Sequence, residues 1–308
     1  MQVFIDLLSF SLESVFPVFA LFATGFVVGK VFSFDPTLLS RLVFWVFGTV
    51  LIFTYVNENP PQFQTIWKYF LGMAGVIFLL GLLFFLLSKW CKRDFRKWAF
   101  PSSFSNTGYL GYPVLEYAIG PHAIPLAVIL STLNTLLIPT YGFFIMDEKG
   151  RKQWAKPFLD FLKIPWIYGL LAGWFLSFWG VRWDRDFPMV FSSYLELLQQ
   201  SAIPIILISV GVSLSRFKPP ARVRAEAWGA AIFKLLVPPL FAVIMGLLLR
   251  MQGLVFQVFV LEVAMPSAVN TAVLAEGIGK EEGFISAVVV YSTFLFLVTF
   301  PIWYSVLF

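Results

Sequence analysis

Long apolar segments dominate this chain of 308 residues, of which 59% are hydrophobic and only 13% are charged. Soluble proteins carry about 25% charged residues, so this composition is typical of a chain that crosses a membrane repeatedly. One span takes about 20 apolar residues in a helix, which satisfies every backbone hydrogen bond inside lipid. We therefore predict an all-α membrane protein with ten transmembrane helices. They cover residues 10–31, 37–56, 66–88, 98–119, 123–146, 164–181, 188–214, 223–250, 254–278 and 283–307.

The composition also argues against several functions. The net charge of +5 does not indicate nucleic-acid binding, because the basic residues lie in short loops between apolar segments. The sequence holds one cysteine, Cys91, and one histidine, His122, and has no glycine-rich phosphate loop. We therefore expect no enzyme activity, no metal and no other cofactor, apart from a coupling Na⁺ or H⁺. The first apolar run continues into a full-length span, which disfavours a cleavable signal peptide.

The basic residues predict how the chain is oriented in the membrane. All but five of the 22 lysines and arginines lie in or beside the loops that follow helices 1, 3, 5, 7 and 9. The exceptions are Lys68, Arg182, Arg185 and Arg250 on the opposite side, and Lys234 within a helix. Because basic loops stay in the cytoplasm, we expect both termini outside. The expected location is the plasma membrane, or the inner membrane of a Gram-negative cell.

Two of the apolar segments are interrupted by residues that disturb helices. NTGYLGYP at 106–113 and MPSAVNT at 265–271 each contain Asn and Pro, and each precedes a short apolar stretch that ends in Gly. Unwound backbone in lipid costs several kcal/mol for each unpaired group, unless it is buried in protein or lines a wet cavity. Paired breaks in the two halves of a chain indicate the substrate site of a secondary transporter.

The two halves also show a faint internal repeat. FPVFALFATG at 16–25 and IPWIYGLLAG at 164–173 share the spacing of Pro and Gly. STL at 131–133 matches STF at 292–294. With five spans in each repeat, the second copy must be inverted in the membrane, which is a recurring plan among transporters.

These observations divide the chain into two predicted repeats. Residues 1–150 form the first repeat, with helices 1–5, and residues 151–308 form the second, with helices 6–10. The breaks in helices 4 and 9 would then meet near the middle of the membrane.

Five stretches resemble the auxin efflux carrier family of bacterial and plant transporters. They are FSNTGYLGYPVLEYAIG at 104–120, AIPIILISVGVSL at 202–214, FKLLVPPL at 233–240, VAMPSAVNTAVLAEGIGKE at 263–281 and STFLFLVTFPIWY at 292–304. The resemblance covers nearly the whole chain. It is specific because it combines the two interrupted helices with the motif of helix 7 at 202–214.

The resemblance implies ten helices in two inverted repeats, with helices 4 and 9 broken and crossing. Helices 1, 2, 6 and 7 would form a scaffold, and helices 3–5 and 8–10 a transport domain. The plan is similar to that of bile acid/sodium symporters and sodium/proton antiporters. Family substrates are organic anions: auxin in plants, and malate, malonate or related carboxylates suggested for bacterial members. The plant proteins have a long central loop, whereas the loop between Met146 and Ile164 is short here, so regulation through it is not expected.

The polar residues of the breaks are the candidate substrate contacts. A helix that restarts after a break offers free N–H groups and about half a positive charge, which suits a carboxylate. Asparagine amides can both donate and accept hydrogen bonds. We expect the substrate or a coupling ion to contact Asn106, Thr107, Gly108, Asn270 and Thr271. The alternative is that these side chains only satisfy carbonyls freed by the breaks.

Three residues are expected to shape the breaks themselves. Pro113 and Pro266 lack a backbone donor and have a fixed φ, which ends a helix. Gly111, like Gly108, permits strained backbone and close approach of helices.

Two ionisable residues could couple transport to an ion. Lys234 lies a third to halfway along helix 8, where a lysine costs about 2.5–3.5 kcal/mol. It is either a counter-charge at the crossing, in place of a bound sodium ion, or a side chain that snorkels to the cytoplasmic interface. Glu262 is either a proton carrier or the partner of Lys234, or else it lies at the outer interface.

Taken together, these features predict a secondary active transporter of a small organic anion, either a carboxylate or an auxin-like molecule. Its transport domain would slide against the scaffold in an elevator mechanism. One alternative is an inorganic cation/proton antiporter of the same architecture, which is disfavoured because neither break contains a carboxylate. Others are a membrane-embedded enzyme and a receptor without transport. The expected partners are the organic anion, the lipid bilayer and a second copy in a homodimer, with no nucleic acid.

Overall fold

The computed structural model describes residues 16–32, 36–92, 95–146, 164–217, 220–278 and 280–308. Within these ranges the secondary structure is helical, apart from one isolated antiparallel bridge between Ser105 and Ser267. Six of the described helices are long and apolar enough to cross a membrane, and three shorter apolar helices accompany them. The predicted start of helix 1 and the central loop at 147–163 lie outside the described residues.

The helices follow the predicted apolar segments within a few residues. The first half contains α2 (Phe16–Val31), α3 (Pro36–Leu42), η2 (Val43–Phe47), α4 (Gly48–Glu58), α5 (Phe63–Cys91), α6 (Arg96–Ser103), η3 (Thr107–Gly111), α7 (Tyr112–Ala118), η4 (Pro121–Ala123) and α8 (Ile124–Met146). The second half contains α10 (Pro165–Phe178), α11 (Trp183–Asp186), α12 (Met189–Arg216), η6 (Ala221–Val223), α13 (Arg224–Leu248), α14 (Gly253–Ala264), α15 (Val269–Ile278) and α16 (Glu282–Leu307). The short helix α11 was not predicted, because its sequence WDRD carries no apolar period.

The chain forms two compact units. Unit 1 comprises residues 1–65, 108–129 and 160–216, and unit 2 comprises residues 66–107, 130–159 and 217–308. Each unit draws on both halves of the sequence. The two inverted repeats and the division into scaffold and transport domain remain predictions.

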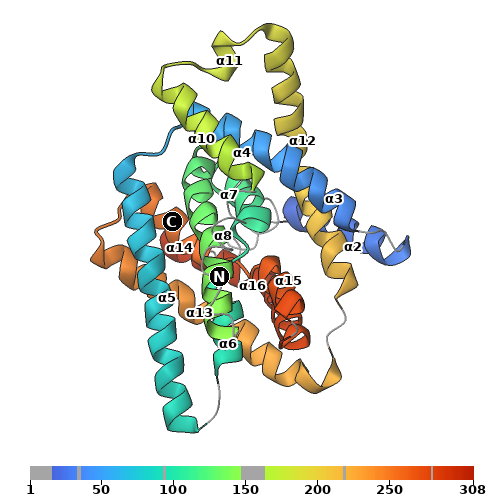
Figure 1. The fold of residues 1–308 in the computed structure, drawn as a ribbon, viewed down its shortest axis with the longest axis vertical. Coiled ribbons are helices and arrows are strands. Elements are labelled where there is room, and N and C mark those ends of the chain that lie inside the picture. The colour runs from blue at the N-terminus through green and yellow to red at the C-terminus, as the bar shows by residue number, and fades with distance from the viewer. Residues whose placement is uncertain (1–15, 33–35, 93–94, 147–163, 218–219, 279) are drawn as a thin grey trace, which may run out of the picture. The chain divides into compact units, whose positions relative to one another are not determined.

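Close helix packing organises unit 1. Figure 1 shows α2 along α12 and α10 along α4. A side chain at Gly25 of α2 would collide with the backbone carbonyl of Ile208 in α12, and one at Gly173 of α10 would collide with that of Phe53 in α4. Small residues of this kind let the backbones of membrane helices approach closely. These are the two glycines that the sequence aligns between its halves.

In unit 2, α13 packs against α14 and α16, and α15 packs against α16. Two prolines, Pro238 and Pro239, lie inside α13. Because proline lacks the N–H group, Pro239 leaves the carbonyl of Leu235 without its usual helical donor. The indole Nε1 of Trp303 in α16 donates to this carbonyl at 2.9 Å. A side chain from a neighbouring helix thus replaces the lost backbone bond, as membrane helices with internal proline require.

Replacing Gly25 with Leu is expected to destabilise the protein, because the new side chain would meet the Ile208 carbonyl. Overpacking of this kind costs about 1–3 kcal/mol. The variant purified in detergent should lose its size-exclusion peak at a lower temperature than the parent protein. Ala23→Leu is the matched control, since Ala23 lies on the same helix and is exposed. Equal melting temperatures for the two variants would contradict the close approach of α2 and α12.

Candidate functional site

Both interrupted segments are unwound in the structure. The first is non-helical at residues 104–106, between α6 and the π-helical turn η3. The second is non-helical at 265–268, between α14 and α15, and it contains Pro266. The first break therefore lies earlier than expected and includes only the opening Asn106 of NTGYLGYP.

Pro113 does not end a helix, and the prediction that it forms the break is wrong. It is the second residue of α7, which directly follows the π-helical turn η3, so the backbone is helical on both sides of it. Gly111 belongs to η3 and has an ordinary helical φ of −59°. Among the described glycines, only Gly120, Gly180 and Gly253 have positive φ. The expected strain at Gly108 and Gly111 is therefore absent.

The two breaks pair with each other through their backbones. The N–H of Asn106 donates to the carbonyl of Pro266 at 2.7 Å, and the N–H of Ala268 donates to that of Phe104 at 3.0 Å. These bonds flank the antiparallel bridge between Ser105 and Ser267. The backbone groups freed by one break are thus satisfied by the other. The expectation that the N–H groups of the breaks stay free for an anion is wrong for Asn106 and Ala268.

The serines of the bridge reinforce this pairing in a reciprocal way. Ser105 Oγ, from the first break, donates to the carbonyl of Val263 near the end of α14 at 2.9 Å. Ser267 Oγ, from the second break, donates to the carbonyl of Pro101 near the end of α6 at 2.8 Å. Each serine therefore caps the helix that leads into the opposite break.

Lys234 of α13 joins this network from within the protein. Its side chain is fully buried, and Nζ donates to Ser105 Oγ at 2.8 Å and to the carbonyl of Val263 at 2.9 Å. The alternative that Lys234 snorkels to the interface is therefore wrong. Its two acceptors are neutral, so no described carboxylate is bonded to its Nζ.

Asn134 of α8 is bonded to the first break, a contact that sequence reasoning missed. Its Nδ2 donates to the carbonyl of Ser105 at 2.6 Å and to Thr107 Oγ1 at 3.2 Å, while its Oδ1 is buried without a described partner. The Nδ2 of the buried Asn106 is likewise without a described partner. One amide donor, Asn106 Nδ2, and one amide acceptor, Asn134 Oδ1, are thus without a described hydrogen-bond partner beside the first break. The only sequence sign was a single Asn in an apolar helix, just after STL at 131–133.

Thr271 and Asn270, the two predicted substrate contacts in the second break, differ in burial. Thr271 is fully buried, and its Oγ1 donates to the carbonyl of Ala268 at 2.6 Å, a carbonyl freed by the break. This bond supports the structural interpretation for Thr271. Asn270, in the first turn of α15, is partly exposed.

Glu262 lies in the last turn of α14 and is fully buried. Neither of its carboxylate oxygens has a hydrogen-bond partner among the described residues. It therefore does not bond to Lys234, and its position relative to the outer interface stays a prediction. On α5, the ionisable Tyr69 lies near Glu262 and stacks on Phe259 with ring centroids 5.6 Å apart.

Comparison with known proteins identifies the family. Residues 10–304 match the model of the membrane transport protein family, which includes the auxin efflux carriers. The chain belongs to this family. It is 28% identical to a protein of Methanothermobacter thermautotrophicus named "Uncharacterized transporter", over 96% of this chain and 98% of that protein. It is 25% identical to a Rhizobium meliloti protein named "Putative malonate transporter", over 92% of each.

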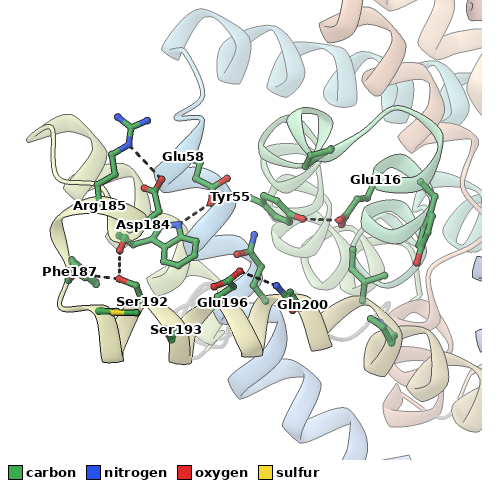
Figure 2. Close-up of a pocket in the computed structure, with 17 residues that line it drawn as sticks. Tyr55, Glu58, Glu116, Asp184, Arg185, Phe187, Ser192, Ser193, Glu196 and Gln200 are labelled. Atoms are coloured by element: carbon green, nitrogen blue, oxygen red, sulfur yellow. Dashed lines mark hydrogen bonds and ion pairs between the residues drawn. The ribbon is translucent and has the colours of Figure 1, made fainter.

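In this member of the membrane transport protein family, unit 1 contains a cavity of about 940 Å³ (Figure 2). Three carboxylates on its lining each accept one bond from a neutral donor. The pairs are Glu116 with the Tyr55 hydroxyl at 2.9 Å, Glu58 with the Trp183 indole at 3.1 Å, and Glu196 with the Gln200 amide at 3.1 Å. This excess of acidic groups does not suit an anionic ligand. The better candidate for an anion site is the crossing, by which we mean the paired breaks at residues 104–106 and 265–268.

Removing the Ser105 hydroxyl is expected to destabilise the paired breaks and so to lower the stability of the protein. Ser105→Ala takes away a donor to Val263 and an acceptor of Lys234, both buried, at a cost of about 1–3 kcal/mol for the unsatisfied group. The melting temperature in detergent should fall. Ser305→Ala is the control, because Ser305 Oγ makes one exposed bond within its own helix. If the two variants melt alike, Ser105 does not stabilise the crossing.

Proposed function

We propose that this protein is a secondary active transporter of a small organic anion. The observation that carries the proposal is the pairing of the two breaks, which holds open amide groups and a buried lysine at one place. Irregular backbone in a membrane protein is tolerated where it builds a binding site or is buried, and transporters place such sites at paired breaks.

The charge at the crossing supports an anion as substrate. Lys234 is fully buried and bonds only to a hydroxyl and a carbonyl, so no described carboxylate neutralises it by direct contact. A buried charge without a partner is costly, and an incoming carboxylate would lower that cost. The open Nδ2 of Asn106 can donate to the same ligand, and the partly exposed amide of Asn270 provides a second polar contact.

These groups and the name of one relative support a small substrate. A small carboxylate can reach an amide donor and lie near one lysine without a large apolar pocket. The relative with 25% identity is named for malonate, a dicarboxylate of this kind. We therefore take malonate as the first substrate to test.

The transport mechanism we propose is an elevator. Both breaks up to Thr107, together with Lys234, Asn134 and Glu262, belong to unit 2. Unit 2 could therefore carry the site as one body against unit 1. From the distribution of basic residues we further propose a plasma-membrane location with both termini outside.

Asn106→Ala and Asn270→Ala should each lower malonate uptake into proteoliposomes by at least about tenfold, since a hydrogen bond to a charged ligand contributes about 1.5–3 kcal/mol. Radiolabelled malonate gives the uptake rate, and the melting temperature of each variant shows whether it folds. Asn59→Ala is the control, because Asn59 is exposed in unit 1. Parental uptake by both site variants would refute the assignment of the site.

An elevator motion should change distances between the units but not within one. The only cysteine, Cys91, can be replaced with Ser, and spin labels placed at exposed positions. Labels at Asn59→Cys in unit 1 and Gln252→Cys in unit 2 should give a distance distribution that shifts when malonate is added. Labels at Asn59→Cys and Leu197→Cys, both in unit 1, should not. Identical distributions for the first pair in every condition would contradict an elevator.

A further inference from the structure

Glu262 is a carboxylate that the proposed substrate site does not use. It is fully buried in the last turn of α14, three residues before the second break begins. Both of its oxygens are without a described hydrogen-bond partner. An ionised carboxylate in this position would carry an uncompensated charge, which protein interiors avoid strongly. Something must therefore neutralise it.

The described ionisable groups around Glu262 do not do so. On α13, Lys234 directs its Nζ to Ser105 and to the carbonyl of Val263. On α5, the Tyr69 hydroxyl donates to the carbonyl of Val255 at 2.9 Å. On α16, Tyr291 stacks on Trp228 and Tyr304 stacks on Phe308.

A divalent metal ion is also a poor match for this position. Calcium and magnesium need several oxygen ligands, carboxylates among them. No group of three or more acidic, histidine or cysteine residues in the described part of the chain could hold a metal. Beside it, Phe259 on the preceding turn of α14 stacks on Tyr69 of α5, and these rings offer no ligand to a metal ion. A proton needs no such ligand shell and neutralises the carboxylate completely.

We propose that Glu262 is the proton-binding site that couples this transporter to the proton gradient. A proton from water on one side of the membrane binds one carboxylate oxygen, and the same proton returns to water on the other side. With Glu262 neutral, the Lys234 charge dominates the crossing and attracts the carboxylate of the substrate. Proton and anion therefore bind together and travel in the same direction. This coupling rests on the proposed anion transport.

The protonation itself can be tested without transport. Infrared difference spectra of the reconstituted protein between acidic and alkaline buffer should contain a carbonyl band of a buried protonated carboxyl group. The band should shift in heavy water and should be missing in Glu262→Gln. Glu276→Gln is the control, because Glu276 is exposed in the same unit, and it should keep the band. A spectrum of Glu262→Gln equal to that of the parent protein would overturn the proton site.

The coupling is tested in proteoliposomes with the membrane potential clamped by potassium and valinomycin. With one proton for each substrate, an inside-alkaline gradient of one pH unit should support up to about tenfold malonate accumulation. A sodium gradient alone should support none. Glu262→Gln, which imitates the protonated carboxyl, should keep measurable malonate exchange but lose accumulation, whereas Glu276→Gln should accumulate malonate.

The possible failures point to different conclusions. Accumulation driven by sodium alone, or by the pH gradient in Glu262→Gln, would overturn proton coupling through Glu262. Absence of exchange for malonate and other small carboxylates in the parent protein would instead refute the proposed function. In that case the infrared band would still decide whether Glu262 holds a proton.

Discussion

The backbone pairing of the two breaks is the interaction on which the rest of this structure depends. Each break frees N–H and C=O groups that would cost several kcal/mol apiece if left unpaired inside lipid. The bonds from Asn106 to Pro266 and from Ala268 to Phe104 satisfy one break with the other. Neither break could persist alone in an apolar surrounding. The hydroxyls of Ser105, Ser267 and Thr271 each donate to a carbonyl at the end of a helix or in a break, and so complete this pairing.

Side chains turn the pairing into a defined site. Ser105 and Ser267 exchange bonds with the helix ends on opposite sides of the bridge, and Lys234 adds two more bonds to the same place. Such buried polar networks are costly when incomplete and specific when satisfied. The two polar groups that this network does not satisfy, Nδ2 of Asn106 and Oδ1 of Asn134, therefore tell more about possible ligand contacts than the groups that it does satisfy.

The sequence predicted the helices and the presence of both breaks, because apolar length and Pro–Asn patterns are local properties. It could not predict that the N–H of Asn106 is bound to Pro266, since that bond joins residues far apart in the chain. Pro113 misled because proline usually ends a helix, whereas here it lies where a π-helical turn runs directly into α7. Asn134 was missed because one amide in an apolar helix forms no motif. The burial of Lys234 and Glu262 also depends on tertiary packing, which cannot be derived from their positions in the sequence.

The buried lysine and the buried carboxylate of unit 2, Lys234 and Glu262, are not explained by stability. Lys234 and Glu262 lie on helices that pack together, and both are fully buried, yet they share no bond. A structural ion pair would have lowered the cost of burying both, and apolar residues would have avoided that cost altogether. Charges inside membrane segments are retained where they handle substrates or ions. The separation of the lysine from the carboxylate is what our two proposals require, because each residue then meets a different ligand: an anion for Lys234 and a proton for Glu262.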